Sequence, residues 1–229
     1  HLHQLVEVDD VARPVDRLFE AVTGRTRHAA VLALSDVSGS LGRGEVMGLV
    51  GDNFSRREVI ERLPGSTACG HTRYSTTGQN ILRNVQPLFA ELDGGGFAIG
   101  HNGNLTNALT LRDSLIKKGA ICQSTTDTEV ILHLVARSEK QHFVEKFIEA
   151  LLQVEGAYAL VGLTHKKLIG ARDPFGIRPL VLGKLGDAWV LASETCALDI
   201  IGAEFVREVE NGEVVVITRE GIESHRFVP

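Results

Sequence analysis

Short apolar runs bounded by glycine or polar turns divide the chain into two groups of predicted strands. The first group covers residues 29–34, 46–50, 67–72 and 97–101. The second group covers residues 157–163, 168–171, 180–183, 189–192, 214–217 and 222–227. The stretch between the two groups has a helical period instead. Strands, then helices, then strands predict two sheets covered by helices, and the short connections between the late strands favour antiparallel pairing.

Apolar residues at helical spacing predict four helices. They lie over residues 11–22, 105–116, 126–135 and 143–152. Gly24 and Gly119 are expected to end the first two. Asn104 is a candidate cap for the second helix, and Thr126 with Glu129 fits a capping box at the start of the third.

Composition limits the kinds of partner that the chain can have. With 229 residues, 43% of them hydrophobic, the chain can bury one large core, and we take it as one domain. A net charge of −5 gives no electrostatic reason to expect nucleic acid or an anionic membrane surface as a partner. No apolar stretch approaches the roughly 18 residues of a membrane span. We therefore expect neither nucleic acid nor a membrane among its partners.

The three cysteines indicate a reducing compartment. Cys69, Cys122 and Cys196 are widely separated and lack metal-type spacing, and any pairing would leave one thiol over. Unpaired thiols are typical of the cytoplasm, which is the expected location.

A loop beyond one predicted strand carries an arginine and several hydroxyl residues. Its sequence, over residues 71–78, is His-Thr-Arg-Tyr-Ser-Thr-Thr-Gly. Arg73 could bind a carboxylate through two parallel hydrogen bonds. The alternative is a structural ion pair, with hydroxyls such as that of Thr76 serving the turn.

A second polar segment, His-Asn-Gly-Asn-Leu over residues 101–105, follows another strand and precedes a helix. We expect Asn102 and Gly103 at a strand-to-helix turn. There, a side-chain amide and a backbone N–H can converge on one oxygen, as an oxyanion site requires. The alternative is that Asn-Gly is simply a turn dipeptide.

A third segment, over residues 124–129, opens a predicted helix and contains Asp127. Its carboxylate could accept a ligand ammonium. A carboxylate in the first turn is also favoured by the helix dipole without any ligand, so capping is the alternative.

A fourth segment, Arg-Asp-Pro-Phe-Gly-Ile-Arg-Pro-Leu over residues 172–180, is a strongly punctuated turn between two strands. Its arginines could dock a partner domain or bridge the hairpin. We expect a structural turn with a role in an interface.

These four segments, with residues 48–54 and 192–199, resemble in their order the glutaminase domain of the amidophosphoribosyltransferase family. The resemblance runs from about Met47 to the end, roughly four fifths of the chain. It implies an α+β fold, a four-layer αββα sandwich of two antiparallel sheets between helices, known as the amino-terminal-nucleophile hydrolase fold. Residues 47–229 would form this class II glutaminase domain, and residues 1–46 its divergent first part.

The resemblance implies that the domain hydrolyses glutamine and passes ammonia to a phosphoribosyltransferase domain, which makes phosphoribosylamine for purine synthesis. Arg73 matches the arginine that holds the glutamine carboxylate, and Asp127 matches the aspartate that holds its α-ammonium. Asn102 and Gly103 match the oxyanion pair, and Thr76 matches a threonine that lines the same pocket.

The family's nucleophile is an amino-terminal cysteine whose own α-amine serves as the base. This sequence begins His-Leu-His-Gln-Leu and has no cysteine before Cys69. We do not expect Cys69, Cys122 or Cys196 to replace it, because none has an evident base beside it. The expectation is a glutamine pocket without hydrolysis in the chain as given.

The resemblance also implies partners and cofactors beyond these residues. The phosphoribosyltransferase domain is absent from the 229 residues, so we expect no cofactor in this chain. The family's transferase domain uses Mg²⁺, some members carry an iron–sulfur cluster, and homo-oligomers are expected. The alternatives are a catalytically silent glutamine-binding or interaction module, and the glutaminase domain of another class II amidotransferase, serving asparagine, glutamate or glucosamine synthesis.

Overall fold

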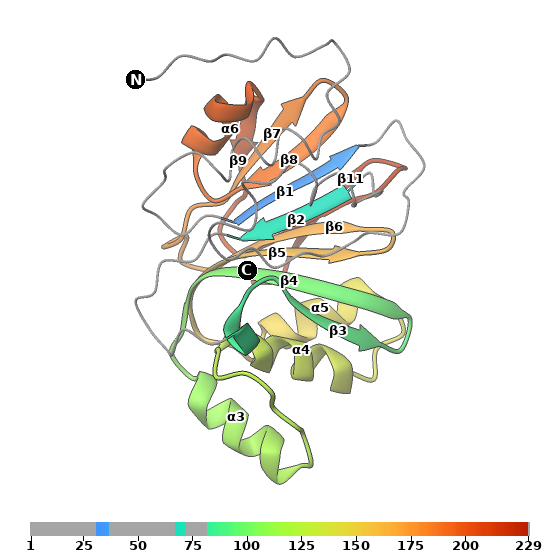
Figure 1. Cartoon of the computed structure of the whole chain (residues 1–229), viewed down its shortest axis with the longest axis vertical. Helices are drawn as coiled ribbons and strands as arrows, with labels where there is room; N and C mark the ends of the chain where they lie inside the picture. The colour runs from blue at the N-terminus through green and yellow to red at the C-terminus, as the bar shows by residue number, and fades with distance from the viewer. Residues whose placement is uncertain (1–30, 37–66, 72–81, 229) are drawn as a thin grey trace.

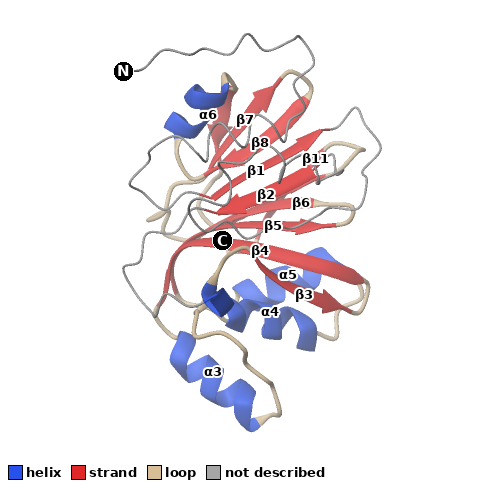
Figure 2. Cartoon of the chain, in the orientation of Figure 1, coloured by secondary structure: helices blue, strands red, loops and turns tan. Residues whose placement is uncertain are grey.

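Two antiparallel sheets face each other in the computed structural model, which describes residues 31–36, 67–71 and 82–228 (Figures 1 and 2). The five-stranded sheet has the order β2-β1-β8-β7-β9. Its strands are β1 (Val31–Asp36), β2 (Thr67–His71), β7 (Val181–Leu185), β8 (Ala188–Ala192) and β9 (Glu204–Glu208). All of its neighbouring strands are antiparallel.

The six-stranded sheet has the order β11-β10-β6-β5-β4-β3, again antiparallel throughout. Its strands are β3 (Leu88–Leu92), β4 (Gly95–Leu105), β5 (Gly156–Thr164), β6 (Leu168–Arg172), β10 (Glu213–Ile217) and β11 (Ile222–Arg226). Short connections join β3 to β4, β5 to β6 and β10 to β11. This is why the late strands pair as predicted.

Helices lie on the outer faces of both sheets. Helices α4 (Thr128–Arg137) and α5 (Phe143–Leu151) cover the six-stranded sheet, and α6 (Thr195–Ile201) packs on β7, β8 and β9 (Figure 1). Helix α3 (Ala108–Lys117) lies beside α4, and a short 3-10 helix, η2 (Leu82–Asn84), precedes β3. The predicted αββα sandwich is confirmed.

Alternation along β4 explains how the layers are held together. Phe97 and Ile99 belong to the core beneath α4 and α5, whereas Ala98 belongs to the core between the sheets. Successive side chains of a strand point to opposite faces, so one strand serves both cores. Phe97 also meets the rings of Phe143 and Phe147 edge to face, at centroid distances of 4.8 and 5.9 Å.

Several local expectations were wrong at the centre of the chain. Strand β4 continues to Leu105, so Asn104 lies in a strand and the cap position of α3 falls to Asn107. The capping box at Thr126 does not form either. The Glu129 carboxylate instead accepts hydrogen bonds from the N–H groups of Gln123 and Ser124.

Other elements were missed or lie outside the described residues. Strands β3 and β9 and helix α6 were not predicted. The predicted helix over residues 11–22 and strand over residues 46–50 fall outside the part of the chain that the structure describes. Within the described part, no helix has both the length and the apolar character needed to cross a membrane.

Candidate active site at the edge of β4

The last third of β4 has a strand neighbour on one side only, as far as the described strands show. β3 pairs with β4 from Gly95 to Ile99, whereas β5 follows β4 as far as Leu105. N–H groups alternate in direction along a strand, so those of residues 101, 103 and 105 point to the side that β3 has left.

Side chains occupy both ends of this row of N–H groups. The His101 N–H donates to Gln86 Oε1 at 2.7 Å, and the Leu105 N–H donates to Asp127 Oδ2 at 2.9 Å. The N–H of Gly103 lies between these two in the row. A backbone donor is therefore directed at the edge of the sheet, beside a carboxylate, where a ligand oxygen can accept it.

Asp127 precedes α4, but its carboxylate does not make the usual N-cap hydrogen bond to an N–H two or three residues further on. It turns toward β4 instead, where Oδ1 lies 3.4 Å from His101 Nδ1. Burial alone would raise the pKa of Asp127, but the hydrogen bond and charge interaction with His101 and the N–H donors of Leu105 and Thr128 outweigh it, and the pKa falls below its usual value. Asp127 is thus a carboxylate at neutral pH.

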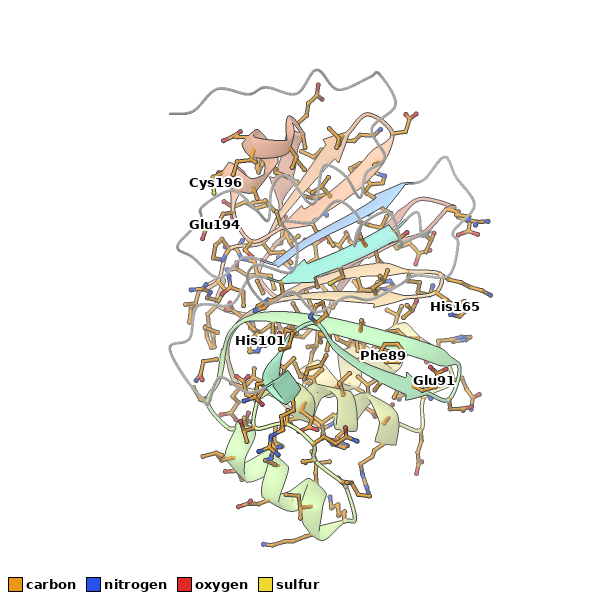
Figure 3. The ribbon with its side chains drawn as sticks, in the orientation of Figure 1. Phe89, Glu91, His101, His165, Glu194 and Cys196 are labelled. Carbon is orange, nitrogen blue, oxygen red and sulfur yellow. The ribbon has the colours of Figure 1, made fainter. Side chains whose placement is uncertain are left out.

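His101, labelled on β4 in Figure 3, contacts the first residue of α4 through its imidazole. Its Nδ1 lies 3.2 Å from Thr128 Oγ1, which also accepts a hydrogen bond from Gln86 Nε2 at 3.3 Å. The imidazole is buried, and its Nε2 has no hydrogen-bond partner among the described residues. These contacts fix the position of Asp127 along β4.

Asn102 points to the opposite face of β4, toward the other sheet. It follows Ala98 in the alternation, and it is 3% exposed. The Arg178 guanidinium donates a hydrogen bond to Asn102 Oδ1. Since a guanidinium can only donate, this bond identifies the acceptor as the carbonyl oxygen of the amide.

Gly103 is required by the backbone. Its φ is +149°, and an added Cβ would lie 2.0 Å from the carbonyl oxygen of Ala157 on β5. Only glycine allows this conformation at such close approach. The pair was predicted at a strand-to-helix turn, and this placement is wrong, since both residues lie within β4.

The segment before Asp127 is shaped by an ion pair that the sequence analysis missed. Glu129 accepts the N–H of Gln123 at 2.6 Å and bonds Arg112 at 2.7 Å. Arg112 also donates to the carbonyls of Ser124 and Thr126. No local signal identifies Arg112, because its partners are 12 to 17 residues away.

In the described part of the chain, Glu129 also belongs to a group of three side chains whose ligand atoms are close enough together to hold a metal ion. Ligand atoms of Cys122, Glu129 and His133 lie within 4.8 Å of one another. Both oxygens of Glu129 already accept hydrogen bonds, and the Arg112 guanidinium beside them would oppose a cation. The geometry therefore gives Glu129 a structural role.

The three cysteines are poorly suited to nucleophilic attack. Burial raises the pKa of Cys69 to about 12. Burial also raises the pKa of Cys122 and Cys196, and the Glu194 carboxylate adds to the effect at Cys196. Cys196 is the second residue of α6 and lies away from His101 on β4 (Figure 3). A high pKa lowers the thiolate fraction, so these thiols would be weak nucleophiles at neutral pH.

The structure places three of the five predicted site residues on or against β4: Asn102, Gly103 and Asp127. None of the hydrogen bonds above joins Asn102 to Asp127 directly. Their relation is set by β4, which contains Asn102 and binds Asp127 through the Leu105 N–H. Arg73 and Thr76 lie outside the described residues. Sequence reasoning missed Gln86, His101 and Arg178, whose partners are distant in the chain.

Comparison with known proteins agrees with this architecture. Residues 71–199, more than half of the chain, match the glutamine amidotransferase domain family. The amidophosphoribosyltransferase of Rhizobium etli is 61% identical over 170 residues, which are 74% of this chain and 34% of that protein. The chain spans about a third of the length of the curated relatives it matches.

Two solved structures share the fold. One is the glutamine phosphoribosylpyrophosphate amidotransferase of Bacillus subtilis complexed with ADP and GMP, with a TM-score of 0.77 and 37% identity, covering 93% of this chain and 45% of that one. The other is described as the allosteric regulatory enzyme of purine biosynthesis, with a TM-score of 0.79 and 37% identity, covering 95% of this chain and 47% of that one.

Two antiparallel sheets between helices, with the candidate site on β4, the second strand from one edge of the six-stranded sheet, define the class as an amino-terminal-nucleophile hydrolase fold. The chain belongs to the glutamine amidotransferase domain family, and it corresponds to the amino-terminal class II domain of the amidophosphoribosyltransferases.

Proposed function

We propose that the chain binds L-glutamine along the edge of β4 and forms the glutaminase part of an amidophosphoribosyltransferase. The observation that carries the proposal is the arrangement of Asp127 and the Gly103 N–H on one edge, with Asn102 adjoining. Asp127 takes the α-ammonium, and Gly103 N–H with Asn102 Nδ2 takes the carboxamide oxygen. By resemblance, Arg73 takes the α-carboxylate and Thr76 lines the pocket.

The spacing along β4 supports this assignment. Asp127 is bound at Leu105, three residues beyond Asn102, which is about 10 Å of strand. An extended glutamine spans about 6 Å from its α-nitrogen to its amide oxygen, and a hydrogen bond at each end adds about 2.9 Å. The two lengths are comparable, so one glutamine can reach both groups.

In the whole enzyme, water would convert glutamine to glutamate and ammonia, and ammonia would displace pyrophosphate from the phosphoribosyl substrate. That second step belongs to a phosphoribosyltransferase domain, with Mg²⁺ at that domain. An iron–sulfur cluster, where a member has one, and homo-oligomerisation are further expectations for the whole protein. The three free cysteines support a reducing, cytoplasmic location.

A silent glutamine-binding module is the second candidate function. The raised pKa values of Cys69, Cys122 and Cys196 favour it, because these thiols would be weak nucleophiles at neutral pH. Both candidates share the same pocket and differ only in whether the bound amide is cleaved.

Isothermal titration with L-glutamine, paired with an assay for released glutamate on the same sample, tests both. Binding that Asp127→Asn weakens and the exposed Asp113→Asn does not would support the pocket. Binding without release would favour the silent module, and release at an enzyme-like rate would favour the glutaminase. If the chain does not bind glutamine, the proposed function is wrong.

A further inference from the structure

The side chain of Gln86 continues the edge of β4 where the backbone of β3 has ended. The pairing of β3 with β4 ends at Leu88 and Ile99, and Gln86 lies two residues before Leu88. Gln86 is buried, and its Oε1 accepts the His101 N–H at 2.7 Å. A backbone N–H can only donate, so the oxygen of the carboxamide faces β4 and the NH₂ group is the other end.

The NH₂ end of Gln86 reaches the first residue of α4. Gln86 Nε2 donates to Thr128 Oγ1 at 3.3 Å, and Thr128 is fully buried. A hydroxyl has one proton to donate and two acceptor positions, and Gln86 occupies one acceptor position. The Thr128 proton is therefore directed away from Gln86. Two groups lie on that side: Asp127 Oδ1 at 3.4 Å and His101 Nδ1 at 3.2 Å.

One arrangement of protons gives each of these contacts a donor and an acceptor. Asp127 is a carboxylate at neutral pH, so its oxygens only accept. The Thr128 hydroxyl then donates to Asp127 Oδ1, and His101 Nδ1 carries a proton that it directs at Thr128 Oγ1 and Asp127 Oδ1. If the hydroxyl donated to His101 Nδ1 instead, Asp127 Oδ1 would face two acceptors.

We infer that Gln86 and Thr128 are positioning residues, which direct the protons of Thr128 and His101 at Asp127 and so hold its carboxylate at the edge of β4 for the α-ammonium of the ligand. The inference rests on the proposed function for the identity of the ligand. A ligand can reach the carboxylate, because the Asp127 side chain is 23% exposed. Both residues act through Asp127, and they set the preference of the pocket for a ligand with an α-ammonium group.

The test compares two ligands that differ only at the α-ammonium. Glutaramate, the monoamide of glutaric acid, has the carboxylate and the carboxamide of L-glutamine but lacks its α-amino group. Isothermal titration measures both ligands with the wild type, Thr128→Val and Thr128→Ser. Valine has nearly the shape of threonine but no hydroxyl, whereas serine keeps the hydroxyl and serves as the rescue variant.

We expect Thr128→Val to lower the affinity for L-glutamine about tenfold, as loss of a hydrogen bond to a charged group does. Its affinity for glutaramate should be unchanged, and Thr128→Ser should retain most of the preference for glutamine. An unchanged preference for glutamine in Thr128→Val would overturn the inference. An equal loss for both ligands would also overturn it, because that result would indicate a merely structural role.

Gln86→Met tests the other partner of the Thr128 hydroxyl. Methionine has a similar length but neither donates to Thr128 nor accepts the His101 N–H in the way that a carboxamide does. The matched control is Gln141→Met, since Gln141 is exposed between α4 and α5. Gln86→Met should lower the preference for glutamine over glutaramate, whereas the control should leave it unchanged. A preference kept in full by Gln86→Met would overturn the assignment of Gln86.

A second measurement needs no ligand and separates this inference from the proposed function. The carboxyl signal of Asp127 in ¹³C spectra, assigned by its loss in Asp127→Asn, follows the pKa of that group. Thr128→Val should raise the lowered pKa of Asp127, because the carboxylate loses one donor and His101 loses its partner at Nδ1. Thr128→Ser should keep the pKa of Asp127 low.

The ring of His101 gives the remaining readout. A ¹⁵N–¹H spectrum of the wild type should show a proton on Nδ1, and a proton on Nε2 alone would overturn the inference. If the wild type binds no glutamine, the proposed function fails. An unchanged pKa of Asp127 in Thr128→Val then also refutes the positioning role, and a raised pKa upholds it.

Discussion

The carboxylate of Asp127 accepts a hydrogen bond at 2.9 Å from the N–H of Leu105, the last residue of β4. This bond joins the start of α4 to the end of β4, where β3 no longer pairs with that strand. The carboxylate is consequently held beside the edge where Gly103 directs its N–H. The relationship gives Asp127 two functions, one in the fold and one in the proposed binding of an ammonium group.

The two functions can be separated with Asp127→Asn. The amide oxygen of asparagine can still accept the Leu105 N–H, but the charge that would bind an α-ammonium is gone. Hydrogen bonds to charged groups contribute about 1.5–3 kcal/mol, so the affinity for glutamine should fall by roughly tenfold to a hundredfold. Isothermal titration measures the affinity, and a melting temperature close to that of the wild type shows that the fold is kept.

Gly103→Ala should destabilise the protein. The new Cβ would lie 2.0 Å from the Ala157 carbonyl oxygen, and φ of +149° is a region that side chains rarely adopt. Strain of this kind costs about 1–3 kcal/mol before the overlap is added. Thermal unfolding should therefore show a melting temperature several degrees lower, since about 1 kcal/mol corresponds to 2–4 °C at this size.

Gly119→Ala is the matched control for the Gly103 variant. Gly119 also has a positive φ, +90°, but nothing lies within 4 Å of an added Cβ. It should lose stability through backbone strain alone. Equal losses in the two variants would contradict the role given to the Ala157 contact.

Stability at low pH should depend on Glu213. Burial alone would raise its pKa, but hydrogen bonds from Arg207, Ser224 and the Glu210 N–H outweigh it and lower the pKa below its usual value. The unfolded chain then binds this proton more readily than the folded protein does. Glu213 therefore contributes stability above the unfolded pKa of about 4.3, and the contribution is lost as the pH falls through the lower folded pKa.

Glu213→Gln measures this contribution directly. At pH 7 the variant should be less stable than the wild type by about 1–3 kcal/mol, because it loses charged hydrogen bonds. The difference should shrink as the pH is lowered below about 4, which denaturant unfolding at several pH values would follow. A difference that stays constant with pH would show that the carboxylate charge is not what stabilises this site.

The sequence predicted the strands of the second half well because their apolar runs are short and sharply bounded. β10, for example, is buried at every position, which a continuous apolar run indicates. β9 was missed for the opposite reason. Four of its five residues are exposed, so no apolar run marks it, and its pairing with β7 defines it as a strand.

The sequence indicated which residues belong to the candidate site, but it did not predict their positions in the fold correctly. Asn-Gly is a common turn dipeptide, which favoured a turn at Asn102, but pairing with Ala159 and Tyr158 of β5 keeps the segment in a strand. Arg178 could not be assigned to Asn102 from the sequence. The two residues are 76 positions apart, and only the antiparallel sheet with its connecting turn brings them together.

The three cysteine thiols should react with a disulfide reagent at different rates, because they differ in exposure. Cys196 is exposed and should react first with a disulfide reagent such as 5,5′-dithiobis(2-nitrobenzoate). Cys69 is buried, with its pKa raised to about 12, and should react only as fast as the protein unfolds, because both access and the thiolate are lacking. Cys122 is partly exposed and should react at an intermediate rate.

Cys196→Ser should remove the fast phase alone. Denaturant should release the slow phase. Protection of any phase by L-glutamine would place that thiol beside the bound ligand and would count against the expectation that none of the three replaces the family's nucleophile.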